Sequence, residues 1–184
     1  MSRPDEILWI SRVVLLDDRR AFGKLMQRYH GRIRRYLFTL TGDEATSDDL
    51  AQTTFIRAWQ GLESFRQLSS FSTWLFRIAY TTYCNHLAQM RNSVVTDLSE
   101  AATEVADESP PENERIESLR QAVARLGEGE RNCITLFYLE EKSIGDIEKI
   151  TGYKQGTIKS HLSRGREHLR EFLNKKDEQH EKRG

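Results

Sequence analysis

Cysteine, proline and glycine are all scarce in this chain of 184 residues, with two, three and eleven copies. Cys84 and Cys133 lie far apart and outside any Cys-x-x-Cys spacing, which favours two reduced core thiols over a disulfide or metal site. So few glycines and prolines provide too few turn-forming residues for a sheet-rich fold. The apolar run Ile7–Leu16, which contains Ser11 and Arg12, is too short to span a bilayer and no small-residue cleavage site follows it. We therefore expect a soluble chain that is not exported.

Net charge is also absent, because Lys plus Arg and Asp plus Glu each total 28. A balanced total argues against a nucleic-acid partner, which usually leaves a basic excess. The charges are unevenly distributed, however. Residues 1–96 hold 13 basic and 9 acidic side chains (+4), residues 97–117 hold 1 and 8 (−7), and residues 118–184 hold 14 and 11 (+3). Two mildly basic blocks therefore flank a short acidic one.

Apolar residues recur every three or four positions in the first block, which predicts amphipathic helices. One such stripe runs from Ala21 to Leu40, and another from Phe71 to Met90. Thr41-Gly42-Asp43 predicts the end of the first helix, and Ser47, followed by two aspartates, predicts the start of the next. We expect residues 1–95 to form one small helical domain.

The acidic block has few large apolar side chains and cannot bury enough surface to order itself, so residues 96–112 are predicted to be a flexible linker. Helical periodicity returns over residues 113–175, and residues 176–184 are predicted to be a charged tail. The predicted fold is all-α, with two small helical domains joined by a flexible acidic linker.

The segment Ser143–Arg170 has the pattern of a helix-turn-helix. A short helix with three isoleucines is followed by Gly152 and then by a second helix, whose apolar stripe runs from Ile158 to Leu173. The other faces of that helix carry hydroxyl and cationic residues, which suit base edges and phosphates in a major groove. The alternative is an ordinary helical hairpin with a solvated basic face. The glycine turn and the mixed hydroxyl and cationic face favour DNA reading.

Aromatic, arginine and hydroxyl residues alternate over residues 64–80. This composition suits unpaired bases, because base–aromatic stacking contributes ~1–3 kcal/mol per base and cations hold the phosphates. Burial in the core is the alternative for Phe71, Trp74 and Phe76, and we expect it for at least one of them. The helix over residues 48–59 has a polar face that is either solvated or suited to docking on another protein. The chemistry therefore indicates a bipartite DNA binder.

The chain offers no candidate active site: it has no Ser-His-Asp set, no metal-ligand spacing and no phosphate-cradling glycine loop, and its five histidines are scattered. Together the helical motifs resemble the extracytoplasmic-function (ECF) sigma factors, the small members of the bacterial sigma family, over about residues 10–95 and 113–173. The motifs are Leu40-Thr41-Gly42-Asp43, Asp49-Leu50-Ala51-Gln52, Phe55-Ile56-Arg57-Ala58-Trp59, Ser64-Phe65-Arg66, the run Phe71–Ala79 and the run Gly156–Arg166.

The resemblance implies sigma domain 2 over residues 1–95 and sigma domain 4 over residues 113–175. It implies a cytoplasmic, non-enzymatic subunit that directs promoter-specific transcription initiation, without a cofactor or a small-molecule substrate. Its implied partners are promoter DNA, the clamp helices and flap of the two large subunits of core RNA polymerase, and an anti-sigma factor, which in this family is often membrane-bound. The acidic linker would thread through the polymerase toward the RNA exit path.

The resemblance also assigns residues to three surfaces. Those implied to read the −35 duplex are Thr157, Lys159, Ser160, His161, Ser163, Arg164 and Arg166. Those implied to open the −10 element and capture an unpaired base are Phe65, Arg66, Ser69, Ser70, Phe71, Trp74, Arg77 and Thr81. Those implied to bind polymerase are Asp49, Gln52, Thr53, Phe55, Ile56 and Trp59.

The chain departs from the usual family residues at Thr53, Thr81, Glu148, Lys154 and Gln155. Thr53 stands where a Glu usually follows the Gln, and Thr81 stands where an Asn commonly helps to hold the flipped base. These departures favour an atypical promoter or a divergent subgroup.

Two alternative functions make different predictions. A helix-turn-helix repressor would bind duplex DNA tightly without polymerase, and a helical adaptor would show no DNA dependence. A sigma factor would bind free DNA weakly, as phosphate neutralisation by a near-neutral chain predicts, but would initiate transcription with core polymerase. We also expect the eight acids of residues 97–117 to repel DNA in the free chain.

Overall fold

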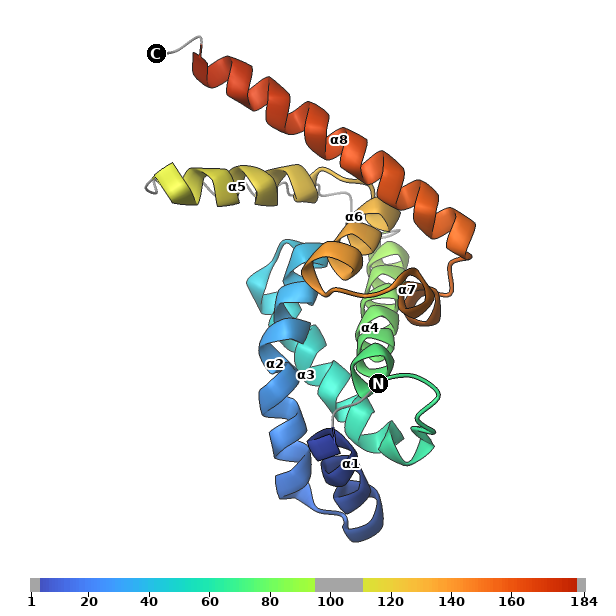
Figure 1. Ribbon diagram of the computed structural model, residues 1–184. Coiled ribbons are helices and arrows are strands. Elements are labelled where there is room, and N and C mark those ends of the chain that lie inside the picture. Colours follow the sequence, from blue (N-terminus) through green and yellow to red (C-terminus); the bar gives the residue numbers. More distant parts are fainter. Residues whose placement is uncertain (1–3, 95–110, 182–184) are drawn as a thin grey trace.

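The computed structural model describes residues 4–94 and 111–181, with side chains over 4–92 and 117–175 (Figure 1). Within these ranges the chain is built from helices and loops with no strand, which confirms the all-α prediction. None of the helices described is long and apolar enough to cross a membrane. Most of the predicted acidic linker lies outside the described residues.

The first half is a four-helix bundle. Its elements are α1 (Pro4–Leu16), α2 (Arg19–Thr41), α3 (Glu44–Gly61), the short η1 (Leu62–Ser64) and α4 (Phe71–Val94). Gly42, at φ 72°, ends α2 in the left-handed conformation that glycine adopts without strain. The expected helix start at Ser47 is wrong, because Asp43 caps α3 by accepting a hydrogen bond from Thr46 N at 2.7 Å.

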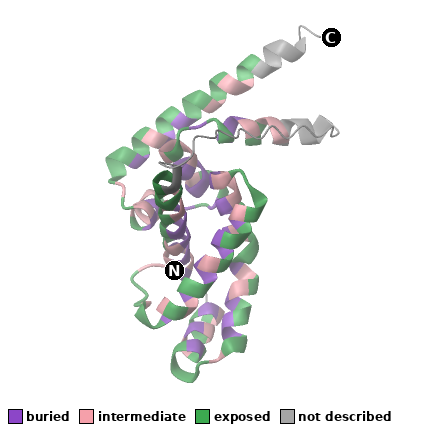
Figure 2. Cartoon of the chain, turned by 180° about the vertical axis from the view of Figure 1, so that it is seen from behind, coloured by how far each residue is buried: buried purple, intermediate pink, exposed green. Residues whose placement is uncertain are grey.

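The bundle core forms where the apolar stripes of α2, α3 and α4 meet, seen as the buried faces in Figure 2. Its largest fully buried side chains are Leu25, Ile33, Tyr36, Leu37, Leu62, Phe71, Leu75 and Phe76. The Tyr36 and Phe76 rings pack edge to face with centroids 5.1 Å apart. This core fixes the loop between η1 and α4 and the outward face of α3, both of which carry predicted functional residues.

The second half comprises α5 (Pro111–Ala124), α6 (Glu128–Ile134), η2 (Thr135–Leu139), α7 (Ile144–Thr151) and α8 (Gln155–Glu181). The backbone of α8 continues through most of the predicted charged tail, because that segment is rich in helix-forming Lys and Glu and contains no proline or glycine before its last residue. Gly165 allows α8 to approach α6 closely, since a Cβ there would lie 2.8 Å from Ile134 Cγ1. The approach fixes the position of α8.

The two halves pack against each other, an arrangement that the sequence patterns do not predict. In Figure 1 α6 and η2 lie on the upper end of α2, α7 lies beside α4, and α5 and α8 project outward. The Tyr36 hydroxyl, fully buried on α2, donates a 2.7 Å hydrogen bond to Asn132 Oδ1 on α6. The junction is therefore a packed interface that includes buried polar groups.

Candidate nucleic-acid interface

A helix-turn-helix is built by α7 and α8. Ser143 begins α7 by accepting a hydrogen bond from Asp146 N at 3.1 Å, and its own hydroxyl donates to Asp146 Oδ2 at 2.6 Å. Gly152, at φ 76°, ends α7 and starts the turn. Ile147 and Ile158 are fully buried between the two helices, so the outer face of α8 points away from its own domain.

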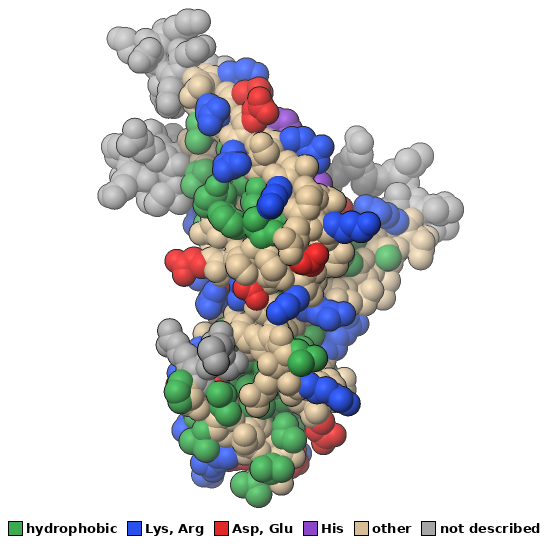
Figure 3. All heavy atoms as spheres, turned by 45° about the vertical axis from the view of Figure 1, so that its right-hand side comes forward, with side chains coloured by type: hydrophobic (Ala, Val, Ile, Leu, Met, Phe, Trp, Pro, Cys, Tyr) green, Lys and Arg blue, Asp and Glu red, His purple; other side chains and the backbone are tan. Residues whose placement is uncertain are grey.

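Most of the residues predicted to read the −35 duplex lie on that outer face. Those exposed there are Thr157, Lys159, Ser160, Ser163 and Arg166. Their side chains make no hydrogen bond or ion pair with any residue that the structure describes. In Figure 3 Lys and Arg predominate over Asp and Glu on the part of the molecule formed by α7 and α8. Donors of this kind are available to phosphates and base edges without breaking an existing contact.

His161 and Arg164 turn instead toward α6. The His161 ring lies against Gly129 and 5.6 Å from the Tyr153 ring, and its pKa is lowered by burial and by the Arg164 charge. Arg164 Nε lies 3.3 Å from Glu130 Oε1. Glu130 also holds His168 Nδ1 at 2.9 Å, so one carboxylate organises the inner flank of the helix. No sequence motif singled out Glu130, since a lone acid in the first turn of a helix is common.

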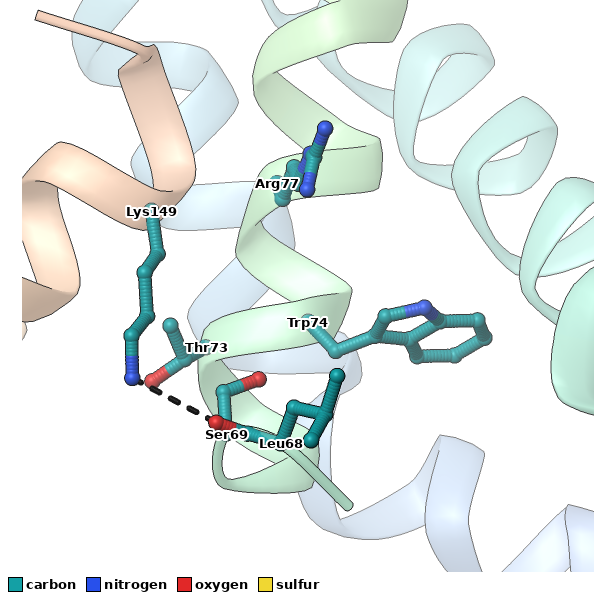
Figure 4. Close-up of a pocket in the computed structure, with 6 residues that line it drawn as sticks. All are labelled: Leu68, Ser69, Thr73, Trp74, Arg77 and Lys149. Atoms are coloured by element: carbon teal, nitrogen blue, oxygen red, sulfur yellow. Dashed lines mark hydrogen bonds between the residues drawn. The ribbon is translucent and has the colours of Figure 1, made fainter. Parts of the chain in front are cut away.

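A second candidate surface is a shallow pocket of about 190 Å³ where the loop before α4 meets its first turns (Figure 4). The residues that line it are Leu68, Ser69, Thr73, Trp74, Arg77 and Lys149. Three of the residues predicted for the −10 element meet here, Ser69, Trp74 and Arg77. The pocket combines an aromatic face, hydroxyls and two cations, which suits an unpaired base with its phosphate. The other three lining residues were not predicted: Leu68, which is 84% exposed, Thr73 and Lys149.

The aromatic residues of this segment divide between core and surface. The ring of Phe71 is 1% exposed and packs against Tyr29 at 5.5 Å, so in this arrangement it presents no open face to a base. Phe65 and Trp74 are half-buried with ring centroids 5.3 Å apart. The buried Phe71 ring supports both of them, because it lies 5.8 Å from Phe65 and 5.6 Å from Trp74.

The other residues predicted for the −10 element surround the pocket. Arg66 and Arg77 are exposed, and the half-buried Ser70 starts α4 by accepting a hydrogen bond from Thr73 N at 3.1 Å. Thr81 is exposed, but its hydroxyl donates to the Arg77 carbonyl at 2.9 Å. Thr81 therefore offers a base an oxygen whose proton is already engaged.

The third surface is the outward face of α3. Asp49, Gln52 and Ile56 are exposed one turn after another, and Ile56 is 52% exposed despite being apolar. Phe55 is different: it is 4% exposed and stacks on His30, so its ring lies in the bundle and not on the outward face of α3. Trp59 is half-buried, with its ring 4.9 Å from that of Phe22.

Neither a metal site nor a disulfide is found among the residues that the structure describes. Cys84 is half-buried and Cys133 fully buried, and both are free thiols. Burial raises the pKa of Cys133 to about 12, which keeps it protonated and unreactive.

Comparisons with known proteins cover both halves of the chain. Residues 25–92 match the Sigma-70 region 2 family and residues 116–169 match the Sigma-70 region 4 family. The chain is 31% identical over 169 residues to the ECF RNA polymerase sigma factor SigW of Bacillus subtilis, which covers 85% of this chain and 90% of that protein. It is 36% identical over 165 residues to the ECF RNA polymerase sigma-E factor of Salmonella typhimurium, which covers 82% and 85%.

A solved structure has a similar fold. The sigma factor RpoE of Bartonella quintana, crystallised with the anti-sigma factor NepR, superimposes with a TM-score of 0.69 at 25% identity, covering 83% of this chain and 96% of that one. The similarity extends across both halves of the chain.

Proposed function

The chain belongs to the ECF sigma factors and directs promoter-specific transcription initiation by RNA polymerase, and from this premise we propose which of its surfaces carry each step. We propose that residues 1–95 act as sigma domain 2, residues 96–112 as the connecting linker and residues 113–175 as sigma domain 4. As a sigma factor the chain is a regulatory initiation factor, and we assign it no catalytic step of its own.

The outer face of α8 reads the −35 element as duplex DNA in the major groove. This is supported by the exposed, unpaired side chains of Thr157, Lys159, Ser160, Ser163 and Arg166. Arg166 and Lys159 suit guanine or phosphate, and the hydroxyls suit either base edges or backbone. Arg164 and His161 act from the inner flank, where Glu130 restricts the direction in which the Arg164 guanidinium points.

The pocket before α4 captures an unpaired base of the −10 element. Trp74 offers a half-exposed ring for stacking, Arg77 a cation for phosphate, and Ser69 a hydroxyl for the base edge. Phe65 supports the Trp74 ring, and Arg66 extends the cationic edge of the loop. Thr81 contributes less to base discrimination than an amide would, because its hydroxyl is directed to a backbone carbonyl.

The exposed face of α3 docks on the clamp helices of the largest polymerase subunit, while domain 4 contacts the flap of the other large subunit. Asp49 and Gln52 supply polar contacts and Ile56 the apolar one, which explains why an aliphatic side chain stands 52% exposed on this face. Thr53 is half-buried beside them. Phe55 and Trp59 hold the helix on its own bundle.

The chain acts in the cytoplasm under the control of an anti-sigma factor. Support comes from the solved relative, a sigma factor in complex with its anti-sigma factor. In this proposal the anti-sigma factor is membrane-bound, as it often is in this family.

The single observation that carries the proposal is the exposed, unpaired hydroxyl and cationic face of α8 in a chain of this family. The test is transcription in vitro with purified core polymerase, this chain and fragmented genomic DNA, followed by mapping of transcript starts. We expect starts that share two sequence elements and that are absent with core alone. Starts that do not depend on the chain would refute the proposal, and tight duplex binding without core would support a repressor instead.

A further inference from the structure

Arg164 is held differently from the other cations on the outer half of α8. Lys159 and Arg166 make no hydrogen bond or ion pair with any residue that the structure describes, whereas Arg164 contacts two side chains. From these contacts, and resting on the −35 reading proposed above, we propose that Glu130 is a positioning residue for base selectivity. Glu130 lies on α6, outside the recognition helix, and aims Arg164 at a guanine of the −35 element.

The two contacts occupy one edge of the Arg164 guanidinium. Its Nε lies 3.3 Å from Glu130 Oε1, and its Nη2 donates to His161 Nδ1 at 3.3 Å. The Nε–H and one N–H of Nη2 point to the same side of this planar group. No hydrogen bond or ion pair to Nη1 is found among the described residues. Nη1 and the second N–H of Nη2 therefore form a free end with two parallel donors.

The contact with His161 requires a neutral ring. An arginine can only donate, so His161 Nδ1 accepts. Burial lowers the pKa of His161, the Arg164 charge lowers it further, and Glu130 opposes the shift. Because the ordinary pKa of histidine is already below 7, the ring is neutral near pH 7 and its nitrogen is available as an acceptor.

Glu130 is itself fixed from several sides. Its side chain is 12% exposed, and its Oε2 lies 2.9 Å from His168 Nδ1. A Cβ at Gly165 would lie 3.6 Å from Glu130 Cβ, and a Cβ at Gly129 would lie 2.7 Å from His161 Cε1. These two glycines let α6 and α8 cross closely beside the carboxylate. The guanidinium is therefore oriented before DNA binds, which lowers the entropy lost on binding.

The chemistry of the free end favours a guanine over a phosphate. Two parallel N–H donors match the O6 and N7 acceptors of guanine in the major groove. The Glu130 carboxylate would repel a phosphate charge at this range, whereas the guanine acceptors are neutral. Arg164 is 56% exposed despite its contacts, so the free end is accessible. Ser160 and Thr157 lie one and two turns before it on the same side of α8, among the residues proposed to face the groove.

The test is transcription in vitro by core polymerase with the full chain, from promoters in which each base of the −35 element is varied. Arg164→Ala identifies the base pair that Arg164 reads, as the position where a preference for guanine is lost. Glu130→Ala should reduce the preference at that same position by about tenfold, the size of one bidentate contact, and should keep the preferences elsewhere. The preference is a ratio between promoters, so a partial loss of folded chain lowers both terms alike.

Two further variants separate the contact from the charge. Glu130→Gln keeps an oxygen that accepts from Arg164, so it should retain most of the preference. Glu167→Ala removes an exposed glutamate three residues after Arg164 that contacts no described residue, and it should leave the preference unchanged. Equal loss in Glu130→Gln and Glu130→Ala, or in Glu167→Ala and Glu130→Ala, would overturn the proposal, because the charge rather than the contact would then set the selectivity.

The double variant Arg164→Ala with Glu130→Ala shows whether Glu130 acts through Arg164. Its selectivity should match that of Arg164→Ala alone, since Glu130 then has nothing to position. Additive losses would overturn the proposal, and so would an unchanged guanine preference in Glu130→Ala. Equal loss of transcription from every sequence in Arg164→Ala would also overturn it, by assigning Arg164 to a phosphate.

The natural chain, run in parallel, distinguishes this proposal from the proposed function. If the natural chain selects among −35 sequences and Glu130→Ala selects the same ones, only the positioning role fails. If the natural chain does not initiate, the proposed function fails, and the positioning role, which rests on it, fails with it.

Discussion

Gly165 sits where the recognition helix crosses α6, and a single methyl group there tests how closely the two helices pack. A Cβ at this position would lie 2.8 Å from Ile134 Cγ1 and 3.2 Å from Ile134 Cδ1. Both distances are well inside van der Waals contact, and Ile134 is itself 3% exposed, so its side chain has little room to move. Gly165→Ala therefore forces α8 away from α6 or Ile134 out of its rotamer.

Two opposing effects decide the magnitude. Alanine in a helix interior is favoured over glycine by about 1 kcal/mol. Overpacking of a dense core costs typically about 1–3 kcal/mol. We expect the cost to dominate, with Gly165→Ala lowering the free energy of unfolding by up to about 2 kcal/mol. Gly31 is the matched control, because a Cβ there meets nothing within 4 Å, and Gly31→Ala should raise stability by about 0.5–1 kcal/mol.

The assay is urea denaturation of the purified chain followed by far-ultraviolet circular dichroism. The steric origin is checked in an Ile134→Ala background, which removes the clashing atoms and leaves a space that the new methyl group fills. There Gly165→Ala should become stabilising. If Gly165→Ala stabilises the natural chain as Gly31→Ala does, the close approach of α8 to α6 is not real and the reasoning fails.

Three further predictions concern the proposed surfaces. Lys159→Ala should weaken use of the −35 element by ~1–3 kcal/mol, because Lys159 is expected to contact a base. The effect is measured as relative transcription from promoters with altered −35 positions. Unchanged selectivity among those promoters would show that Lys159 does not read the −35 sequence. Trp74→Ala should impair strand opening, followed by permanganate reactivity, more than duplex binding, whereas a pure loss of folding stability would assign Trp74 to the core. Burial lowers the pKa of Lys142 to about 8, against an ordinary 10.5 for a lysine in water. The Arg32 charge reinforces this shift, and the carboxylates of Asp146, Glu140 and Glu6 oppose it. Lys142 lies at the junction of the two halves, where its amine donates to the Ser72 hydroxyl. The protonated amine therefore disfavours the packing of the two halves below pH 8, and this packing should strengthen by up to about 3 kcal/mol as pH rises toward 10.5. Lys142→Met should abolish the effect in a measurement of energy transfer between the halves against pH.

Much of the fold could be predicted from periodicity. The stripe from Phe22 to Leu40 predicts the buried face of α2. Its last four members are fully or almost fully buried: Ile33, Tyr36, Leu37 and Leu40. Helix starts were less predictable, because several hydroxyl and acidic residues precede α3 and only the structure shows that Asp43, rather than Ser47, caps it. Ser47 is instead buried, and its hydroxyl donates to the Glu44 carbonyl at 2.7 Å.

The candidate surfaces were predictable to a lesser degree. The residues on the outer face of α8 could be predicted from its apolar stripe, because residues off the stripe point outward. Phe55 and Phe71 share their segments with exposed neighbours, and composition alone cannot separate the ring that stacks on a base from the ring that supports it. The interdomain contacts could not be predicted, because Glu140 and Lys142 resemble surface charges in a sequence and are buried only by a partner distant along the chain.

The central claim is that this sigma factor reads two promoter elements with domains that are docked on each other in the free chain. It is tested most directly by energy transfer between dyes at Gln60 on α3 and Arg170 on α8, both exposed, each replaced by cysteine in a Cys84→Ser background. We predict a single high-transfer state for the free chain and a low-transfer state when core polymerase and promoter DNA are added. Transfer that is the same in the free chain and in the promoter complex would contradict the account.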